Sequence, residues 1–318
     1  MTEQLNVQQM AEKLLAADNV LILCHKNPDG DTIGCGSALY YALSALDKTA
    51  AVLCSDAVPG RYAFTNPRLY KGEFEPEIVV AVDVASVQLF GENNGMPQFS
   101  RHVDLCIDHH AGNSGYAEYT LLDGHAAAAA ELLYDVICAM GVDLTAHMAN
   151  CLYTGLSTDT GCFKFSSTTA RTHIIAAKLM EAGARVEELN TLLFDTKPRE
   201  RMEAERIARN HLEYHLDGRC ALIYLTRDEI EQSKVDPADL EELKATVYRY
   251  TFDILGLRDE KAAGAASGRD YVTPLVEMLL DERLKARAAK DWAASDRIRD
   301  GLAAAGIRVK DRLSLIHI

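Results

Sequence analysis

The sequence has no apolar run that approaches the length of a membrane-spanning helix. Its first residues, Met-Thr-Glu-Gln, lack the basic and apolar segments of a secretory signal peptide. Its eight cysteines include no Cys-x-x-Cys pair, and several of them lie inside apolar runs, which indicates buried free thiols. These absences argue against a membrane protein and against a disulfide-stapled secreted protein. We therefore expect a protein of the reducing cytoplasm.

Basic residues are scarce, because 33 Lys and Arg stand against 47 Asp and Glu, for a net charge of −14. Such acidity argues against a non-specific grip on long nucleic acid, which needs many cations against the phosphate backbone. Short nucleotides are not excluded, because bound cations would make a local site positive. The length of 318 residues suggests about two domains, and the hydrophobic share of 48% is ample for a core.

Short apolar runs alternate with helix-like segments over the first two thirds of the chain. The runs typical of buried strands are Val20–Cys24, Ala50–Cys54, Glu77–Asp83 and Val103–His110. Helical periodicity is found in Val7–Leu15, Ile33–Leu46, Ala126–Met140, Leu144–Leu156 and Thr168–Ala182. Strands separated by helices predict an α/β fold, a mostly parallel sheet with helices on both faces.

The first apolar run leads to His25, and the turn-rich segment that follows places Asp29 and Asp31 on either side of one glycine. In open α/β sheets, ligands bind at the carboxyl ends of the strands. One imidazole nitrogen and two carboxylates suit a divalent cation such as Mn²⁺ or Mg²⁺. The alternative is a turn whose acids cap the next helix. This stretch alone does not decide between the two interpretations.

Three later segments repeat the pattern. Asp83 ends the third apolar run, Asp108 is followed by His109 and His110, and Asp159 lies in a Ser-Thr-Asp-Thr-Gly segment after a predicted helix. A lone Asp in such a place usually caps a helix. Four segments that each deliver Asp or His at a strand end or turn are poorly explained by capping, which favours the metal site.

The motifs His-x-x-x-Asp-x-Asp, a strand-end Asp, Asp-His-His and Thr-Asp-Thr-Gly, in this order, resemble those of the DHH phosphoesterase family. The resemblance covers roughly residues 7–243. It is strongest to the branch of small exonucleases that degrade very short RNAs and remove the 3′-phosphate from 3′-phosphoadenosine 5′-phosphate (pAp). It implies an Mn²⁺-dependent phosphoesterase with two ions per chain, Mg²⁺ or Co²⁺ being alternatives, that acts on short oligoribonucleotides, on pAp or on both.

The resemblance also implies six metal ligands that form two groups around one shared carboxylate. One ion would be bound by His25 and Asp29, the other by Asp31, His109 and Asp159, with Asp83 bridging the pair.

Three further residues receive roles from the resemblance. Asp108 would fix a histidine tautomer and ring orientation. His110 would contact the phosphate and protonate the leaving oxygen. Asn113 would add a phosphate or structural hydrogen bond. For Asp108 and Asn113 a simple turn is an equal alternative. For His110 we favour the catalytic role, because adjacent side chains on a strand cannot both face one metal.

We predict three parts of the chain: a DHH phosphoesterase domain at 1–194, a linker with a partial DHH-associated domain at 195–244, and a helical tail at 245–318. The linker, Arg199–His215, is charged and helical in pattern, and Cys220–Thr226 is strand-like. The Gly-Gly-x-His loop expected of a complete second domain is absent from the sequence. The tail resembles the C-terminal helices of cysteinyl-tRNA synthetase, without that enzyme's catalytic and zinc-binding parts, so we hypothesise a fusion of two partial genes.

The alternatives to the exonuclease or pAp phosphatase are a phosphodiesterase of cyclic or linear dinucleotides, and a catalytically weak nucleotide- or metal-binding remnant. The remnant is considered because the second domain is incomplete. The expected partners are short oligonucleotides or small phosphorylated nucleotides, with no long duplex and no membrane. A homodimer is left open.

Overall fold

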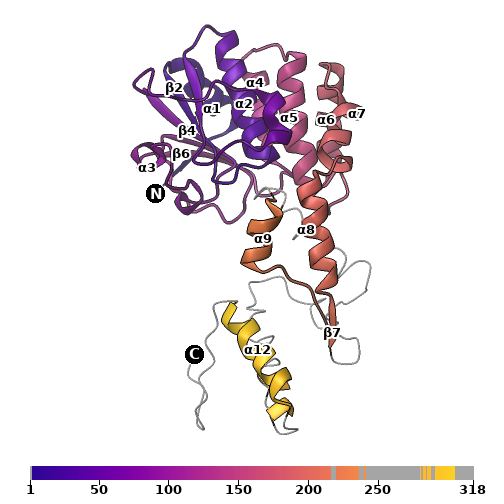
Figure 1. Cartoon of the computed structure of the whole chain (residues 1–318). Coiled ribbons are helices and arrows are strands. Elements are labelled where there is room, and N and C mark those ends of the chain that lie inside the picture. The colour runs from indigo at the N-terminus through magenta and orange to yellow at the C-terminus, as the bar shows by residue number, and fades with distance from the viewer. Residues whose placement is uncertain are drawn as a thin grey trace. The chain divides into compact units, whose positions relative to one another are not determined.

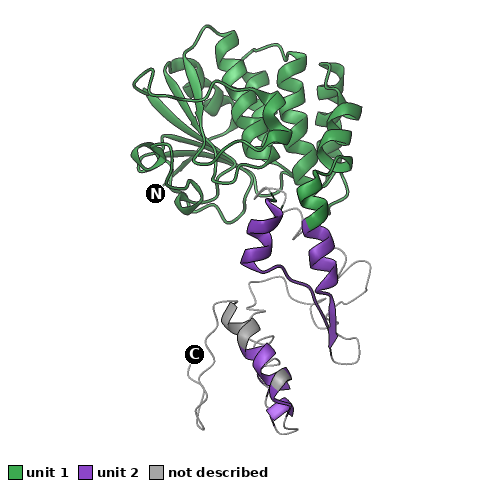
Figure 2. Cartoon of the chain, in the orientation of Figure 1, with its two compact units in different colours: residues 1–203, 235–243 green, residues 204–234, 244–318 purple. Residues whose placement is uncertain are grey.

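The structure is a computed structural model that describes residues 2–215, 220–235, 240, 280, 282–283, 285–287 and 291–304. The chain divides into two compact units (Figures 1 and 2). The first comprises residues 1–203 and 235–243, and the second comprises residues 204–234 and 244–318. The predicted domain boundaries at residues 194 and 244 stay predictions.

A six-stranded sheet forms the centre of the first unit, in the order β1-β6-β5-β4-β2-β3. Its strands are β1 (Glu3–Gln4), β2 (Val20–Leu23), β3 (Ala50–Leu53), β4 (Ile78–Val82), β5 (Leu105–Asp108) and β6 (Tyr119–Leu122). Every pairing between them is parallel. The predicted α/β fold with a mostly parallel sheet is therefore confirmed, although the sequence did not reveal β1 and β6.

Helices and short turns cover the sheet. The α-helices of the first unit are α1 (Val7–Ala16), α2 (Gly30–Ala45), α3 (Met96–Phe99), α4 (Ala129–Ala139), α5 (Ala146–Asp159), α6 (Ala170–Glu181) and α7 (Val186–Asn190). Shorter helical turns are η1 (Gly60–Thr65), η2 (Val87–Leu89) and η3 (Thr191–Asp195). No helix in the described part of the chain combines the length and the apolar character that crossing a membrane requires.

Both faces of the sheet are buried. Alternate residues of a strand point to opposite faces, so a strand such as β2 contributes to two apolar clusters. Val20 and Ile22 join a large apolar cluster with helices α1, α2, α4 and α5, whereas Leu21 and Leu23 join a smaller cluster with α3. The strand order places β2, β4 and β5 side by side. Their carboxyl ends therefore share one edge of the sheet, and the predicted site residues follow these three strands.

The second unit contains α8 (Arg199–Asn210, which begins in the first unit), β7 (Glu213–His215), β8 (Cys220–Leu222), α9 (Arg227–Ser233) and α12 (Trp292–Ala304). β7 and β8 form an antiparallel pair. The predicted helix from Arg199 to His215 is thus wrong at its end, because the Glu-Tyr-His segment pairs its backbone with β8. Charge pattern alone could not reveal that partner. Of the predicted helical tail at 245–318, residues 280, 282–283, 285–287 and 291–304 are described, and the rest lies outside the described residues.

Candidate metal centre

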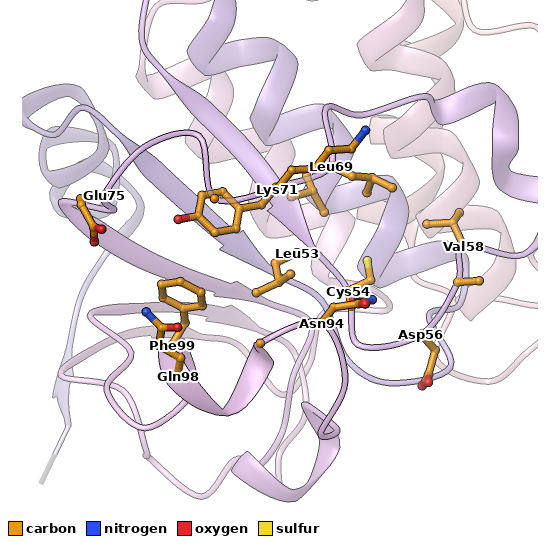
Figure 3. A pocket seen from close by; sticks show the side chains of 15 residues that line it. Leu53, Cys54, Asp56, Val58, Leu69, Lys71, Glu75, Asn94, Gln98 and Phe99 are labelled. Atoms are coloured by element: carbon orange, nitrogen blue, oxygen red, sulfur yellow. Dashed lines mark hydrogen bonds between the residues drawn. The ribbon is translucent and has the colours of Figure 1, made fainter.

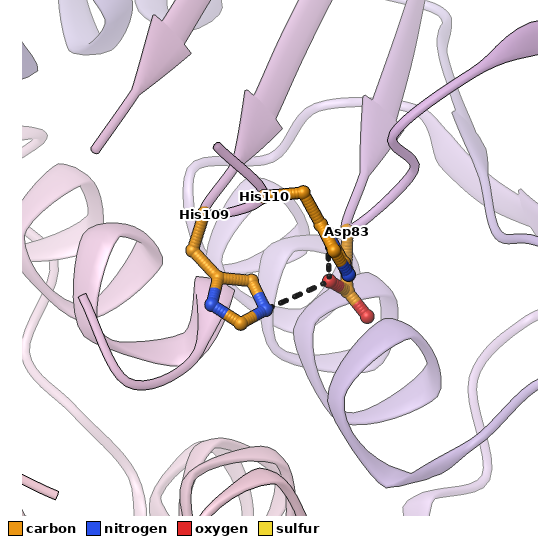
Figure 4. Close-up of side chains that lie close together, drawn as sticks. All are labelled: Asp83, His109 and His110. Carbon is orange, nitrogen blue, oxygen red and sulfur yellow. Dashed lines mark ion pairs between the residues drawn. The ribbon is translucent and has the colours of Figure 1, made fainter. Parts of the chain in front are cut away.

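The three central strands deliver their polar residues to one place. His25 lies two residues beyond β2, Asp83 directly follows β4, and Asp108 ends β5. His109 and His110 come next in the chain, and their side chains lie close to that of Asp83 (Figure 4). The remaining predicted ligands come from two helices. Asp29 is the N-cap of α2 and Asp31 lies in its first turn, and Asp159 is the last residue of α5. Asp159 is therefore helical, and the predicted helix end at Leu156 is three residues too early.

Asp83 occupies the middle of this cluster and is almost fully buried. Its Oδ2 lies 3.9 Å from Nε2 of His25, and its Oδ1 lies 3.5 Å from Nε2 of His109. The two oxygens of one carboxylate thus face two different histidines. Asp83 also has a φ of 58°, which lies in the left-handed region. A residue other than glycine is strained there, and such strain recurs at functional sites.

On one side of Asp83, Nε2 of His25 lies 3.4 Å from Oδ1 of Asp29. The Nδ1 atom of His25 is 2.7 Å from the carbonyl oxygen of Lys26. With Nδ1 donating its proton to that carbonyl, the lone pair is on Nε2, which is the atom that faces the carboxylates. Such a bond behind the ring is the usual arrangement for a metal-ligating histidine.

On the other side, Nε2 of His109 lies 3.2 Å from Oδ2 of Asp159 and 3.9 Å from Oδ2 of Asp31. Nδ1 of His109 is 3.2 Å from the carbonyl oxygen of Ala126, which repeats the arrangement seen at His25. The donor atoms of His25, Asp29 and Asp83 lie within 4.8 Å of one another, and so do those of Asp31, His109 and Asp159. The structure thus brings all six predicted ligands together, and it also places donor atoms of Asp83, His109 and His110 within 4.8 Å of one another, so the division into two groups stays a prediction.

The donor set fits divalent cations. Oδ1 of Asp83 and Nε2 of His109 are buried and have no hydrogen-bond partner among the residues that the structure describes. A buried polar atom without a partner is costly, and both atoms point into the shared space between the two groups. Carboxylate oxygens combined with imidazole nitrogens are ligands of Mn²⁺ and related ions.

The cluster concentrates charge of one sign. Burial, followed by the nearby Asp31 carboxylate, raises the pKa of Asp83 well above its ordinary value. Burial and the Asp159 carboxylate raise the pKa of Asp31 to about 7. Burial lowers the pKa of His109, but the carboxylates of Asp159 and Asp83 outweigh this and raise it to about 12. Without a cation, the cluster therefore retains protons, which reduce the repulsion between its carboxylates. A bound divalent cation would reduce the same repulsion and displace these protons.

Asp31 has a second contact that the sequence did not reveal. Its Oδ2 accepts a hydrogen bond from the backbone N–H of Ala129 at 2.6 Å, and its Oδ1 accepts one from Ala130 at 3.1 Å. These residues begin α4, whose own N-cap, Ala128, has no side-chain hydrogen bond. A carboxylate from α2 thus caps α4, where the helix dipole favours negative charge.

Asp108 orients the second histidine of its motif. Its Oδ1 lies 2.7 Å from Nδ1 of His110, and its Oδ2 accepts a 2.6 Å hydrogen bond from the side-chain amide of Asn113. Burial raises the pKa of the Asp108 carboxyl, but the hydrogen bonds from His110 and Asn113 outweigh burial and hold it below its ordinary value. Asn113 also accepts a hydrogen bond from the backbone of Gly115, so it stabilises a turn as well.

The alternation argument for the two histidines is wrong. Nδ1 of His110 lies 3.5 Å from Oδ1 of Asp83, the same distance as Nε2 of His109. β5 ends at Asp108, so the two histidines follow the strand and do not alternate across it (Figure 4). They differ in exposure and partners: the side chain of His110 is 45% exposed and that of His109 is 14% exposed.

In the described part of the chain, two of the cavities lie away from this cluster. One of about 600 Å³ lies against β3 and α3, and its lining includes Leu53, Tyr70, Asn94 and Phe99 but none of the predicted ligands (Figure 3). The other, of about 350 Å³, is mostly polar and includes Lys26, the residue after His25. Only the second lies next to a predicted ligand in the chain.

Gly155 permits the close approach of α5 to Asp31, because a Cβ atom at position 155 would overlap Oδ1 of Asp31. Gly155→Ala is expected to lower the free energy of unfolding by about 1–3 kcal/mol, the usual cost of overpacking. That cost exceeds the gain of about 0.5–1 kcal/mol that alanine brings within a helix. Urea denaturation measures it, with Gly60→Ala as control because a Cβ there meets nothing within 4 Å. Equal stability of the two variants would show that Asp31 has room to move.

Comparisons with known proteins agree with the geometry. Residues 19–156 match the model of the DHH family, N-terminal domain, and residues 270–314 match that of the cysteinyl-tRNA ligase anticodon binding domain. The chain is 33% identical over 193 residues to the bifunctional oligoribonuclease and PAP phosphatase NrnA of Thermus thermophilus, covering 58% of this chain and 56% of that protein. The chain thus spans about half the length of this relative.

The end of the chain has different relatives. It is 47% identical over 97 residues to a cysteine–tRNA ligase of Phocaeicola vulgatus, which covers 30% of this chain and 19% of that enzyme.

A crystal structure of an exopolyphosphatase-related protein from Bacteroides fragilis is similar in fold, with a TM-score of 0.64, 24% identity and 74% coverage of each chain. The resemblances of the sequence to a DHH domain and to a synthetase tail are both confirmed.

Proposed function

We propose that this chain, which carries a DHH-family domain over residues 19–156, is a phosphoesterase that depends on divalent metal ions. The observation that carries the proposal is Asp83, whose two oxygens face His25 and His109, each at the centre of its own ligand group. A carboxylate has two oxygens and can therefore be shared by the two cations of a two-metal site. We assign His25 and Asp29 to one Mn²⁺, and Asp31, His109 and Asp159 to the other.

The substrates that we propose are short oligoribonucleotides, cleaved from the 3′ end, and pAp. The Thermus thermophilus relative is named as a bifunctional oligoribonuclease and PAP phosphatase, which supports both. The net charge of −14 disfavours long nucleic acid, so the attraction for phosphate has to be local. Cyclic and linear dinucleotides contain the same bond and stay as alternatives. The proposed partners are thus small nucleotides, and we place the protein in the cytoplasm.

The chain's own residues supply orientation and proton transfer. Divalent cations at this centre would activate a water molecule and stabilise the entering and leaving oxygens at phosphorus. His110 holds its Nδ1 proton against Asp108, whose carboxylate stabilises the ring when it is protonated. The Nε2 atom of His110 then gives its proton to the leaving oxygen. Asn113 holds the other oxygen of Asp108 and so fixes the orientation of both side chains.

A second candidate is a nucleotide- or metal-binding remnant without useful turnover. The observation in its favour is the small sheet of the second unit, which within the described residues contains only the β7–β8 pair. Turnover of bis(p-nitrophenyl) phosphate in the presence of Mn²⁺ separates the candidates, because this diester needs little binding beyond the metal centre. A panel of pAp, di- to pentanucleotides and cyclic dinucleotides, each with Mn²⁺, Mg²⁺ and Co²⁺, then identifies the substrate.

Metal content tests the centre itself. We expect about two Mn²⁺ per chain after saturation and desalting, as two-metal phosphoesterase sites require. A separate surface cluster of His102, Asp104 and Glu118 also has donor atoms within 4.8 Å of one another, and His102 is 75% exposed. His102→Ala is therefore the control, and it should leave the content unchanged. Only trace metal in the parent chain would remove the basis for the assignment.

A further inference from the structure

A strained turn follows the last predicted ligand. Asp159 is the last residue of α5. Shortly after it, the three consecutive residues Gly161, Cys162 and Phe163 have φ values of 56°, 57° and 62°. Three consecutive residues in the left-handed region are unusual, and two of them are not glycine, so their side chains crowd the backbone. Strain of this kind persists only where the surrounding structure imposes it, and it clusters at active sites and ligand clamps.

Thr160 holds the turn in place. Its carbonyl oxygen accepts hydrogen bonds from the backbone N–H groups of Lys164 and Phe165, at 2.8 and 3.0 Å. Its hydroxyl accepts one from the N–H of Phe163 at 3.0 Å and lies 2.7 Å from the carbonyl oxygen of Leu156 in α5. The turn is therefore tied to the same helix end that carries Asp159.

The turn carries two phenylalanines with different surroundings. Phe163 stacks on His173 of α6, with ring centroids 5.1 Å apart, so packing accounts for it. The ring of Phe165 lies against Gly161, where a Cβ atom would overlap it, and Phe165 is nevertheless 53% exposed. Within the described part of the chain, no other aromatic ring is found against Phe165. The turn after Asp159 thus exposes an aromatic side chain to solvent, on a residue whose backbone is hydrogen-bonded to Thr160, the neighbour of Asp159 in the chain.

We propose that Phe165 is the platform on which a nucleobase of the substrate stacks while the phosphate lies at the metal centre. This inference rests on the proposed function. A flat apolar ring suits any base, because every base has a π face, and stacking therefore gives affinity without selecting a sequence. An isolated exposed apolar residue needs no explanation on its own. Phe165 differs because a strained turn, hydrogen-bonded to Thr160, holds its backbone six residues after Asp159, which is the last residue of α5 and a proposed metal ligand.

The test compares two substrates that differ only in the base. These are pAp and ribose 3′,5′-bisphosphate, which has both phosphates and no base. Phe165→Ala is expected to raise KM for pAp by about 10-fold, within the range that alanine substitution of a stacking ring gives, and to leave kcat nearly unchanged. KM for ribose 3′,5′-bisphosphate should not change. Phe165→Trp should restore KM for pAp, because a larger ring also stacks.

Ile174→Ala is the matched control, because Ile174 is an equally exposed apolar residue, at 61%, on α6. An equal change for both substrates, or no change for pAp, would overturn the proposal. If the parent chain hydrolyses neither pAp nor ribose 3′,5′-bisphosphate, the proposed pAp activity fails, and the stacking is measured by calorimetric titration of both compounds with Mn²⁺ present. Weaker binding of pAp alone to Phe165→Ala would then support the platform, and unchanged binding would overturn it.

Discussion

Asp83→Asn is expected to leave the chain folded, to lower its Mn²⁺ content below two per chain and to reduce turnover by about 10³-fold or more. Metal ions contribute several kcal/mol to the stabilisation of charge in such reactions, and each 1.36 kcal/mol is a factor of ten in rate. The amide has one oxygen and no negative charge, so it cannot serve the His25 and His109 groups together. Metal analysis and single-turnover rates on the same sample measure both effects.

Asparagine is the right replacement here because it tolerates the left-handed backbone that Asp83 adopts, and because the N–H of residue 83 keeps its 2.9 Å bond to Ile107. Asp47→Asn provides a matched control, since Asp47 is an exposed aspartate whose φ of 57° is also left-handed. If Asp83→Asn kept both ions and full activity, the shared carboxylate would not be the bridge.

His110→Ala is expected to slow the chemical step by about 10²–10⁴-fold, the usual share of a general acid, with metal content near normal. The reason is that Nδ1 of His110 is held by Asp108 at 2.7 Å, whereas Nε2 of His109 makes no hydrogen bond within the described residues and faces the carboxylates of Asp31, Asp83 and Asp159. Rates with bis(p-nitrophenyl) phosphate and metal analysis of the same protein separate the two roles.

The comparison with His109→Ala decides the assignment, because both rings lie 3.5 Å from Oδ1 of Asp83. His109→Ala should lose metal and activity together. His125→Ala, at an exposed histidine outside the cluster, should change neither. Loss of metal in His110→Ala but not in His109→Ala would mean that the two histidines have exchanged roles.

The ends of β2, β4 and β5 were visible in the sequence, because each apolar run stops at a histidine or an aspartate. The order that makes these strands neighbours was not visible, since pairing depends on contacts between distant segments. β6 is no shorter than β2, β3 or β5, but it was missed because Thr120 interrupts the apolar run in Tyr119–Leu122. The two ligand groups were predicted from the resemblance alone, and the structure brings their six members together.

Other features needed tertiary structure. The bonds from Asp31 to Ala129 and Ala130 join residues 98 and 99 positions apart, and no local pattern predicts them. The rule that adjacent side chains point to opposite faces holds only within a strand. It does not apply to His109 and His110, because β5 ends at Asp108 and the backbone turns there. The strand β7 was hidden in a charged segment that resembles the helix before it.

The cap that Asp31 provides for α4 complicates how variants of the cluster should be interpreted. Its carboxylate is at once a proposed metal ligand and the acceptor for two backbone N–H groups of another helix. An inactive Asp31→Ala protein would therefore combine two defects, a lost metal ligand and a frayed N-terminus of α4. Adding more Mn²⁺ would correct only the first defect. Asp159 makes no such bond to a helix start among the interactions that the structure records. To test the metal position formed by Asp31, His109 and Asp159, Asp159 is therefore a better residue to replace than Asp31, because its loss would remove a ligand without removing a helix cap.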